Sequence, residues 1–203
     1  MLTARFPAAP LSMSDHQTAN DPHAVPSAWT APGAAPLEVD FGCHRGAFLI
    51  EMAAADPGRN YLGIERQSAR VEICNRRIGR RRLHNALAVR GEGTAALEEL
   101  LPPASVETLH VSFPDPWPKR RHAGRRLVTA GFLAGAARVL RRGGVLRLMT
   151  DDASYFGEMA ALTRHGWSQV PWLDGVERPQ TTFEKTFRAL GKSPFQLAVV
   201  AQC

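Results

Sequence analysis

From Leu37 onward the sequence alternates between short apolar runs, which predict strands, and longer runs with helical apolar spacing, which predict helices. The predicted strands cover residues 37–41, 60–65, 86–90, 106–113, 145–150, 167–173 and 195–201. The predicted helices cover residues 47–55, 68–82, 94–101, 127–140 and 155–165. Strand–helix units of this length form parallel strands with helices on both faces of the sheet. The alternation therefore predicts an α/β fold.

Residues 1–36 have a different composition, rich in Ala, Pro, Ser and Thr and without apolar periodicity. Such a segment cannot bury enough apolar surface to offset its ordering entropy, so we expect a mostly flexible arm. Trp29 is its only large anchor, and it either docks on the rest of the chain or stays exposed. Residues 37–203 are then one domain, since 203 residues with 44% hydrophobic content can bury one sizeable core.

The composition limits the partners. A formal net charge of +6 favours a polyanionic partner, because basic surfaces release counterions from phosphates on binding. The cysteines Cys43, Cys74 and Cys203 are scattered and lack C-x-x-C spacing, so we expect neither a disulfide framework nor a metal site. No apolar stretch reaches the roughly 20 residues that span a bilayer, and no signal-peptide pattern opens the chain. We expect a cytoplasmic protein that binds no membrane and no metal.

Carboxylates stand at or just after the ends of the first five predicted strands. They are Asp40, Glu65, Glu92, Asp115 and Asp151. One such residue is usually a helix cap or a solvated turn. Five in succession would crowd negative charge into one crevice at the carboxyl edge of the sheet, unless a ligand with donors or positive charge offsets it. The pattern predicts a ligand site at that edge.

The first two of these acids favour a nucleoside cofactor. Glu65 is placed to accept both hydroxyls of a ribose, and Gly42 and Gly46 let backbone and ligand approach closely. His44 takes the place of the middle glycine of an acid-x-G-x-G-x-G turn. The turn lacks the lysine of a P-loop and its acids would repel a pyrophosphate, so a zwitterionic or cationic cofactor is favoured. We take Asp40 as the acid of this turn and keep Glu38 as the alternative.

Residues 113–126, F-P-D-P-W-P-K-R-R-H-A-G-R-R, follow the fourth predicted strand. Proline fixes φ and removes a backbone donor, so the three prolines exclude a helix and predict a stiff, extended loop. The loop would present Asp115 and Trp117, and Trp117 either stacks on an exposed base or covers the core. No acid lies between Asp115 and Asp151, so this stretch is the better phosphate-binding candidate. Its basic residues are Lys119, Arg120, Arg121, Arg125, Arg126, Arg138, Arg141, Arg142 and Arg147.

Several motifs, in this order, resemble those of the bacterial tRNA (guanine-N(7)-)-methyltransferases. They are the region 37–49, N-Y-L-G-I-E at 60–65, F-P-D-P-W-P-K at 113–119, T-D at 150–151 and T-x-F-E at 181–184. The resemblance extends from about residue 37 to the C-terminus, and F-P-D-P-W-P-K is its most specific part. It implies a class I methyltransferase with a Rossmann-like, seven-stranded, mostly parallel sheet, which uses S-adenosylmethionine to methylate a guanine of tRNA, in the variable loop.

The resemblance also implies residue roles. The cofactor would be bound by Asp40, Glu65, Glu92 and Asp115, together with the glycines of the turn. Asp115 would also be catalytic. The residues that would meet the substrate are Lys119, Asp151, Thr181 and Glu184.

The chemistry supports carboxylates in these places. Guanine N7 carries a lone pair and no proton, so it can attack a sulfonium methyl group without a strong general base. Catalysis then consists of alignment and of stabilising the purine as it becomes cationic. Asp151 has the alternative role of a helix N-cap, and Thr181 with Glu184 could form an ordinary turn.

Two other functions remain open. The chain could methylate another RNA or a small molecule, or it could be a catalytically weak RNA-binding relative, since His44 departs from the glycine pattern and residues 1–36 lack a basic stretch. The sequence is compatible with a monomer or a homodimer.

Overall fold

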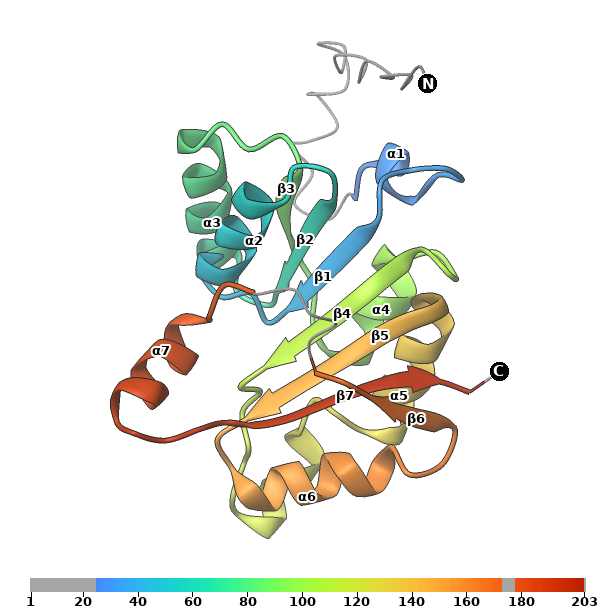
Figure 1. Ribbon diagram of the computed structural model, residues 1–203, viewed down its shortest axis with the longest axis vertical. Helices are drawn as coiled ribbons and strands as arrows, with labels where there is room; N and C mark the ends of the chain where they lie inside the picture. Colours follow the sequence, from blue (N-terminus) through green and yellow to red (C-terminus); the bar gives the residue numbers. More distant parts are fainter. Residues whose placement is uncertain (1–24, 173–177, 203) are drawn as a thin grey trace, which may run out of the picture.

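The computed structural model describes residues 25–172 and 178–202, and they form one sheet between layers of helices (Figure 1). The strands are β1 Leu37–Phe41, β2 Asn60–Glu65, β3 Ala86–Arg90, β4 Val106–Ser112, β5 Leu140–Thr150, β6 Trp167–Val170 and β7 Phe195–Ala201. The strand order is β3-β2-β1-β4-β5-β7-β6. Neighbours among β1 to β5 pair in parallel, whereas β7 runs antiparallel to β5 and β6. The prediction of a seven-stranded, mostly parallel α/β sheet is confirmed.

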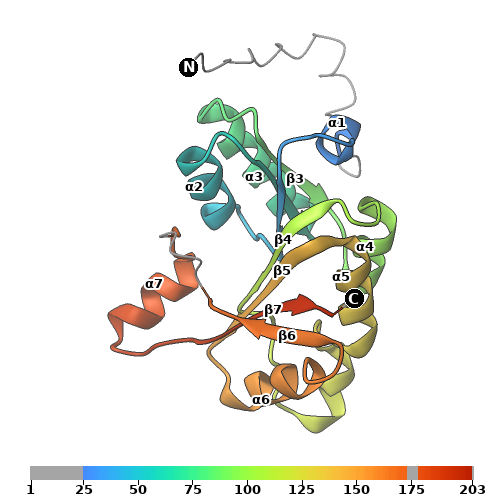
Figure 2. The same ribbon diagram turned by 45° about the vertical axis from the view of Figure 1, so that its right-hand side comes forward.

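Helices cover both faces of this sheet (Figure 2). They are α1 Ser27–Thr30, α2 Ala47–Ala55, α3 Ser68–Arg80, α4 Gly93–Leu100, α5 Ala130–Val139, α6 Ala153–Leu162 and α7 Thr182–Ala189, with a 3-10 turn at Arg120–Arg125. Side chains alternate between faces along each strand. Leu62 and Ile64 of β2 therefore join the larger core under α4, α5 and α6, whereas Tyr61 packs with α2 and α3.

The strand order places the ligand crevice. The chain runs from β1 outward to β2 and β3, then returns to place β4 on the other side of β1. The loops after β1 and β4 thus leave the sheet side by side at its carboxyl edge. In open α/β sheets this reversal of strand order is where ligands bind.

Trp29 docks on the rest of the chain, the first of the two alternatives left by the sequence. Its side chain is 8% exposed and belongs to the larger core, together with Leu37 of β1. The single turn α1 positions it, and Val25 packs alongside.

Several predicted boundaries differ from the structure. The strand predicted over 167–173 ends at Val170, and residue 173 lies outside the described residues, while α6 begins at Ala153 rather than at residue 155. β5 begins at Leu140 rather than at residue 145. Its pairing with β4 shifts register between Val106 and Thr108, so the residues predicted as a turn before residue 145 belong to the strand. The helix predicted from residue 127 begins at Ala130, because the Thr129 side chain accepts the Phe132 N–H (3.1 Å) and caps it there.

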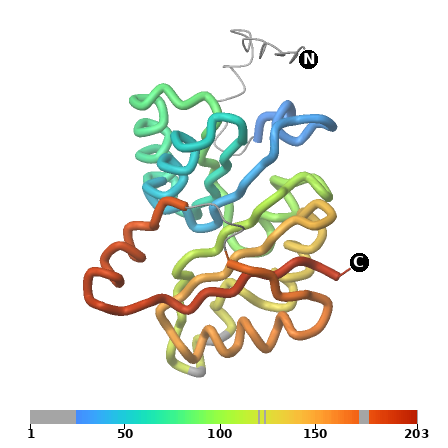
Figure 3. Tube along the Cα trace, viewed as in Figure 1, coloured from blue at the N-terminus to red at the C-terminus, as the bar shows by residue number. Residues whose placement is uncertain are grey.

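Helix α7 was not predicted. Thr181 caps it by accepting the Glu184 N–H at 3.0 Å, so the alternative of an ordinary turn for these residues is wrong. The spacing Thr-x-x-Glu is a known signal for a helix start. Figure 3 shows α7 beside the sheet layers, with its first turn toward α2. In the described part of the chain, every helix is too short or too polar to cross a bilayer.

Candidate active site

An open cleft of about 1250 Å³ lies at the carboxyl edge of the sheet. Its walls come from the turn after β1, the ends of β2 and β3, the loop after β4 and the first turn of α7. Small-molecule pockets usually measure about 300–1000 Å³, so this cleft is larger than one small ligand needs. Six of the predicted site residues line it: Asp40, Gly42, Glu65, Glu92, Asp115 and Thr181.

The turn after β1 owes its shape to left-handed backbone. Gly42 (φ 85°) donates its N–H to the Ile64 carbonyl at 2.8 Å, and His44 adopts φ 53° although it carries a Cβ. At Gly46 (φ 70°) a Cβ would overlap the Cys74 Sγ, so only glycine fits. The His44 side chain is exposed on the cleft, and partial burial followed by the nearby Arg70 lowers its pKa.

Glu65 is held rigidly at the end of β2. Its carboxylate is buried and accepts the His44 N–H at 3.1 Å on Oε2 and the Gln67 N–H at 3.0 Å on Oε1. Arg70 Nη1 lies 3.6 Å from Oε1. Each carboxylate oxygen has a further lone pair, so Glu65 keeps acceptor capacity toward the cleft.

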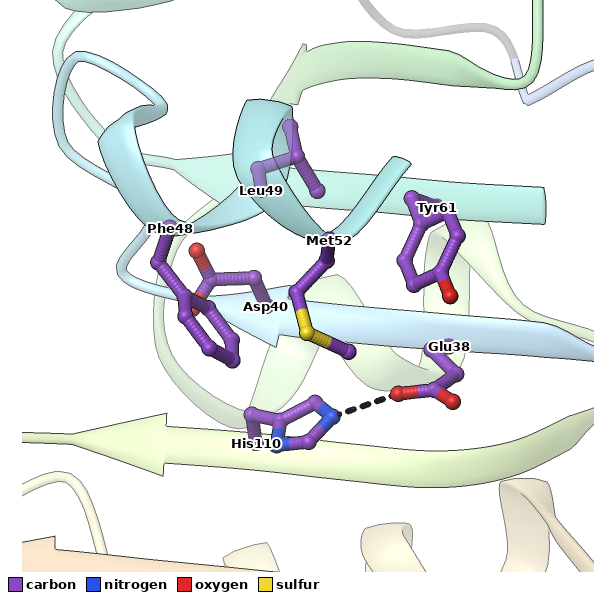
Figure 4. A pocket seen from close by; sticks show the side chains of 7 residues that line it. All are labelled: Glu38, Asp40, Phe48, Leu49, Met52, Tyr61 and His110. Carbon is purple, nitrogen blue, oxygen red and sulfur yellow. Dashed lines mark hydrogen bonds and ion pairs between the residues drawn. The ribbon is translucent and has the colours of Figure 1, made fainter. Parts of the chain in front are cut away.

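Asp40 lines both the cleft and a small neighbouring pocket, whose lining residues are drawn in Figure 4. Phe48 and Met52 of α2 pack over it together with His110 of β4. Asp40 is 6% exposed, and burial, followed by the like charge of Glu65, raises the pKa of its carboxyl group to about 7. A positive ligand charge would favour the ionised form.

Glu38 lies two residues earlier on the same face of β1 and lines the small pocket but not the cleft. Its Oε2 is 2.8 Å from His110 Nε2 and accepts a hydrogen bond from Arg178 Nη1 at 3.1 Å. Arg59 Nη1 lies 3.5 Å from Oε1. Glu38 is therefore occupied by internal partners, and of the two acids considered for the turn it is Asp40 that reaches the cleft.

The loop after β4 is bent rather than extended. Phe113 (φ 52°) and Trp117 (φ 42°), which both precede prolines, adopt left-handed backbone, so the prediction of an extended loop is wrong at these two residues. Arg126 fixes the bend: its Nε donates to the Pro116 carbonyl at 2.7 Å and its guanidinium pairs with Glu158. Asp115, between the two bends, is exposed on the cleft.

Trp117 lines the cleft and is only half-buried. The Arg125 guanidinium lies 5.1 Å from its ring centroid, and His122 approaches the ring edge-on. It is not part of either hydrophobic core, which disfavours the role of covering the core.

The other predicted site residues are dispersed. Glu92 lines the cleft with a side chain that is 75% exposed, and lies 3.9 Å from Arg66. Glu184 is buried and binds Arg188 of the same helix at 2.8 and 2.9 Å. Lys119 and Asp151 are exposed and do not line the cleft. The cap of α6 is Asp152, which accepts the Tyr155 N–H at 2.7 Å, so the alternative cap role for Asp151 is wrong.

Several of the basic residues after Asp115 serve the fold. Arg147 is buried in β5 with its guanidinium 5.9 Å from the Trp172 ring, and Arg138 donates to the carbonyls of Leu97 and Leu101. The exposed ones are Lys119, Arg121, Arg125, Arg141 and Arg142. The phosphate-binding candidates are therefore fewer than the sequence suggests.

Three residues at or beneath the cleft escaped the sequence analysis. Phe183 lines the cleft in α7, and His110 and Arg178 hold Glu38. Polar residues at alternate positions of two predicted central strands, such as Glu38 with Asp40 and Thr108 with His110, were a usable signal for a polar sheet face. Cys43 and Cys74 are buried free thiols, and no three metal-ligating side chains converge in the described residues.

Comparison with known proteins identifies sequence relatives. Residues 34–197 match the family model described as "Putative methyltransferase". The chain is 34% identical over 171 residues to a tRNA (guanine-N(7)-)-methyltransferase of Limosilactobacillus fermentum, covering 80% of this chain and 79% of the relative. A protein of the same name from Levilactobacillus brevis is 34% identical, with 88% of both chains covered. One from Thermosynechococcus vestitus is 37% identical, with 74% and 75% covered.

Solved structures share the fold at low sequence identity. The aminoglycoside resistance methyltransferase NpmB1 superposes with a TM-score of 0.59 at 19% identity, covering 82% of this chain and 87% of that one. The antibiotic-resistance methyltransferase Kmr gives a TM-score of 0.56 at 22% identity, covering 85% and 89%. These likenesses establish the class I methyltransferase fold.

Proposed function

The chain belongs to the tRNA (guanine-N(7)-)-methyltransferase family, and on that premise we propose that it transfers a methyl group from S-adenosylmethionine to N7 of a guanine in tRNA. One observation carries the residue assignments. Asp40, Glu65, Glu92 and Asp115 come from four different strand ends and line one cleft. From the basic stretch that follows Asp115, Arg125 and Arg126 line the same cleft.

The residues of the cleft fit a nucleoside cofactor that carries positive charge. Glu65 is oriented by two backbone N–H groups and has lone pairs left for the two ribose hydroxyls. Asp40 has a like-charged neighbour in Glu65, and a cationic ligand would offset this repulsion. Gly42, with no Cβ, leaves space beside the turn. Bound S-adenosylmethionine supplies a methyl group on a positively charged sulfur.

Asp115 is the proposed catalytic residue. N7 of guanine needs no base to remove a proton, so the protein must align the base and stabilise its growing positive charge. Asp115 is exposed on the cleft wall, and the bends at Phe113 and Trp117 fix its backbone on both sides. A carboxylate in such a fixed position can face the purine without reorganising.

Lys119, Asp151, Thr181 and Glu184 are the proposed substrate contacts. Thr181 lines the cleft, while Glu184 supports the same helix through Arg188. Asp151 is exposed after β5 and leaves the cap of α6 to Asp152, so its carboxylate is free to meet a part of the tRNA outside the cleft. Lys119 and the exposed arginines that follow it would bind phosphates of the tRNA.

The methyl acceptor can be identified directly. Unmodified tRNA should be incubated with the protein and labelled S-adenosylmethionine, then digested to nucleosides. We expect the label in 7-methylguanosine, and mapping should place it in the variable loop. Label in a different nucleoside would instead favour the alternative acceptor. Absence of cofactor binding at millimolar concentration would favour the RNA-binding relative.

Because its proposed substrate is tRNA, we propose that the enzyme is cytoplasmic. We also propose that the enzyme acts as a monomer or a homodimer. Light scattering on the purified protein, with and without tRNA, distinguishes these two states. A larger assembly would contradict the proposal.

Cofactor affinity should fall as pH falls below about 7. Burial and then Glu65 raise the pKa of Asp40 to about 7, and a cationic cofactor requires the ionised carboxylate. Below that pH, binding must release a proton, so Kd should rise about tenfold per pH unit and stay level above it. Titration calorimetry between pH 5.5 and 7.5 measures this slope.

Two variants check the origin of the slope. Asp40→Asn should bind more weakly and lose the pH dependence, whereas Glu92→Gln, at an exposed carboxylate of the same cleft, should retain it. A wild-type Kd that is constant across this range would refute the role assigned to Asp40.

A further inference from the structure

We propose that Phe183 and Phe113 form the surface on which the acceptor guanine stacks, and that this surface stabilises the purine as N7 is methylated. The inference rests on the proposed function, because it places the base of that reaction in the same cleft. It adds two positioning residues to the carboxylates.

Phe183 differs from other exposed apolar residues because it lies in the wall of the cleft. Its side chain is 68% exposed, and a single exposed apolar residue is by itself ordinary. Leu190 of the same helical stripe is 67% exposed, yet it lies outside the cleft, whereas Phe183 is part of the cleft wall. The exposed aromatic ring is thus available to a ligand of the cleft.

Phe113 supports this ring. The two ring centroids are 5.8 Å apart with 30° between the ring planes, so the rings are nearer to parallel than to edge-on. Phe113 holds its position with left-handed backbone before Pro114, which is unfavourable for a residue with a Cβ. The unfavourable backbone turns the chain so that the Phe113 ring and Asp115 both reach the cleft.

The pair lies between the two proposed substrate-facing regions. Asp115 follows Phe113 by two residues in the loop after β4, and Thr181 and Glu184 flank Phe183 at the start of α7. Contact between the rings therefore joins the catalytic loop to the helix that would meet the guanine edge. A base on this surface would have Asp115 on one side and α7 on the other.

The chemistry of the acceptor matches an aromatic surface. Purines stack on aromatic side chains, and π faces attract cations. Guanine is neutral before the reaction and positively charged after N7 gains the methyl group. The aromatic surface thus binds the transition state more strongly than the ground state, which is the condition for a contribution to kcat.

The test compares Phe183→Leu, Phe183→Tyr and Leu190→Ala, the last as a control with matched exposure. Phe183→Leu should lower kcat for tRNA methylation about tenfold, with the Kd for S-adenosylmethionine unchanged within twofold. Phe183→Tyr, which keeps the ring, should restore kcat, and Leu190→Ala should match the wild type. Thermal unfolding of all three verifies that each variant is folded.

A binding measurement separates stacking from packing. Wild-type protein, titrated with 7-methylguanosine 5′-monophosphate and with guanosine 5′-monophosphate, should bind the cationic nucleotide more tightly. Phe183→Leu should lose that preference and Phe183→Tyr should keep it. A leucine variant with wild-type kcat and wild-type nucleotide preference would overturn the inference alone. A wild type that forms no 7-methylguanosine in tRNA would overturn the proposed function as well.

Discussion

Replacing Asp115 with asparagine should lower kcat for methyl transfer by about two to three orders of magnitude, the effect of removing one preorganised electrostatic group. Asparagine has the same shape but carries no charge, so it cannot offset the positive charge that develops on the purine. Single-turnover rates at saturating tRNA and S-adenosylmethionine measure the chemical step. Calorimetric titration of the cofactor separates a loss of binding from a loss of rate.

The fold should survive this substitution. Asp115 is exposed on the cleft, and exposed substitutions usually change stability by about 0.5 kcal/mol or less. Glu98→Gln, at an exposed carboxylate of α4 outside the cleft, is the matched control and should retain wild-type kcat. Turnover of Asp115→Asn within threefold of wild type would show that this carboxylate is not catalytic.

Replacing Glu38 with glutamine should lower the free energy of unfolding by about 3–5 kcal/mol, as expected when one partner of a buried ion pair is removed. The Glu38 side chain is 4% exposed, and its carboxylate offsets the Arg178 guanidinium at 3.1 Å. The variant leaves that cation, whose side chain is 17% exposed, without its counterion. Because Arg178 lies three residues before the cap of α7, the variant should also loosen the α7 wall of the cleft.

The effect should depend on pH. Burial alone would raise the pKa of Glu38, but the hydrogen bonds and charges of His110 and Arg178 outweigh it and lower the pKa to about 2. The folded pKa is below the ordinary value of 4.5, so the stabilisation is present above pH 4.5 and is lost as pH falls toward 2. The stability difference between wild type and variant should shrink across this window.

Urea unfolding at pH 7, 4 and 3 measures that difference. Glu72→Gln is the control, since its side chain is 68% exposed and pairs with Arg76 on the helix surface. It should change stability by about 0.5 kcal/mol or less. Equal effects of the two variants at pH 7 would contradict a stabilising role for the buried pair.

The sequence predicted the sheet well because strand and helix patterns are local. β1, β2, β3 and β7 have the predicted bounds, since each is a short apolar run bordered by residues that end it. Two of the boundary errors arose where a local signal was overridden. A pairing irregularity with β4 extended β5, and the Thr129 cap delayed the start of α5.

The candidate site was predictable to the extent that it depends on strand ends. Asp40, Glu65, Glu92 and Asp115 were singled out because parallel strands bring their carboxyl ends to one edge, and all four line the cleft. Asp151 obeys the same rule and yet lies outside the lining. The position of a residue at a strand end predicts at which edge of the sheet it lies. The conformation of the following loop determines whether its side chain lines the cleft.

By itself the sequence determined the strands of the sheet, most of its helices and which acids stand at the strand ends, because these depend on neighbouring residues. Only the tertiary structure decided that Asp40 faces the cleft while Glu38 binds Arg178, 140 residues away in the chain. It also decided that Trp29 is buried and that Phe183 meets Phe113. Such contacts depend on strand order and on how distant segments pack. Neither can be predicted from a pattern of neighbouring residues.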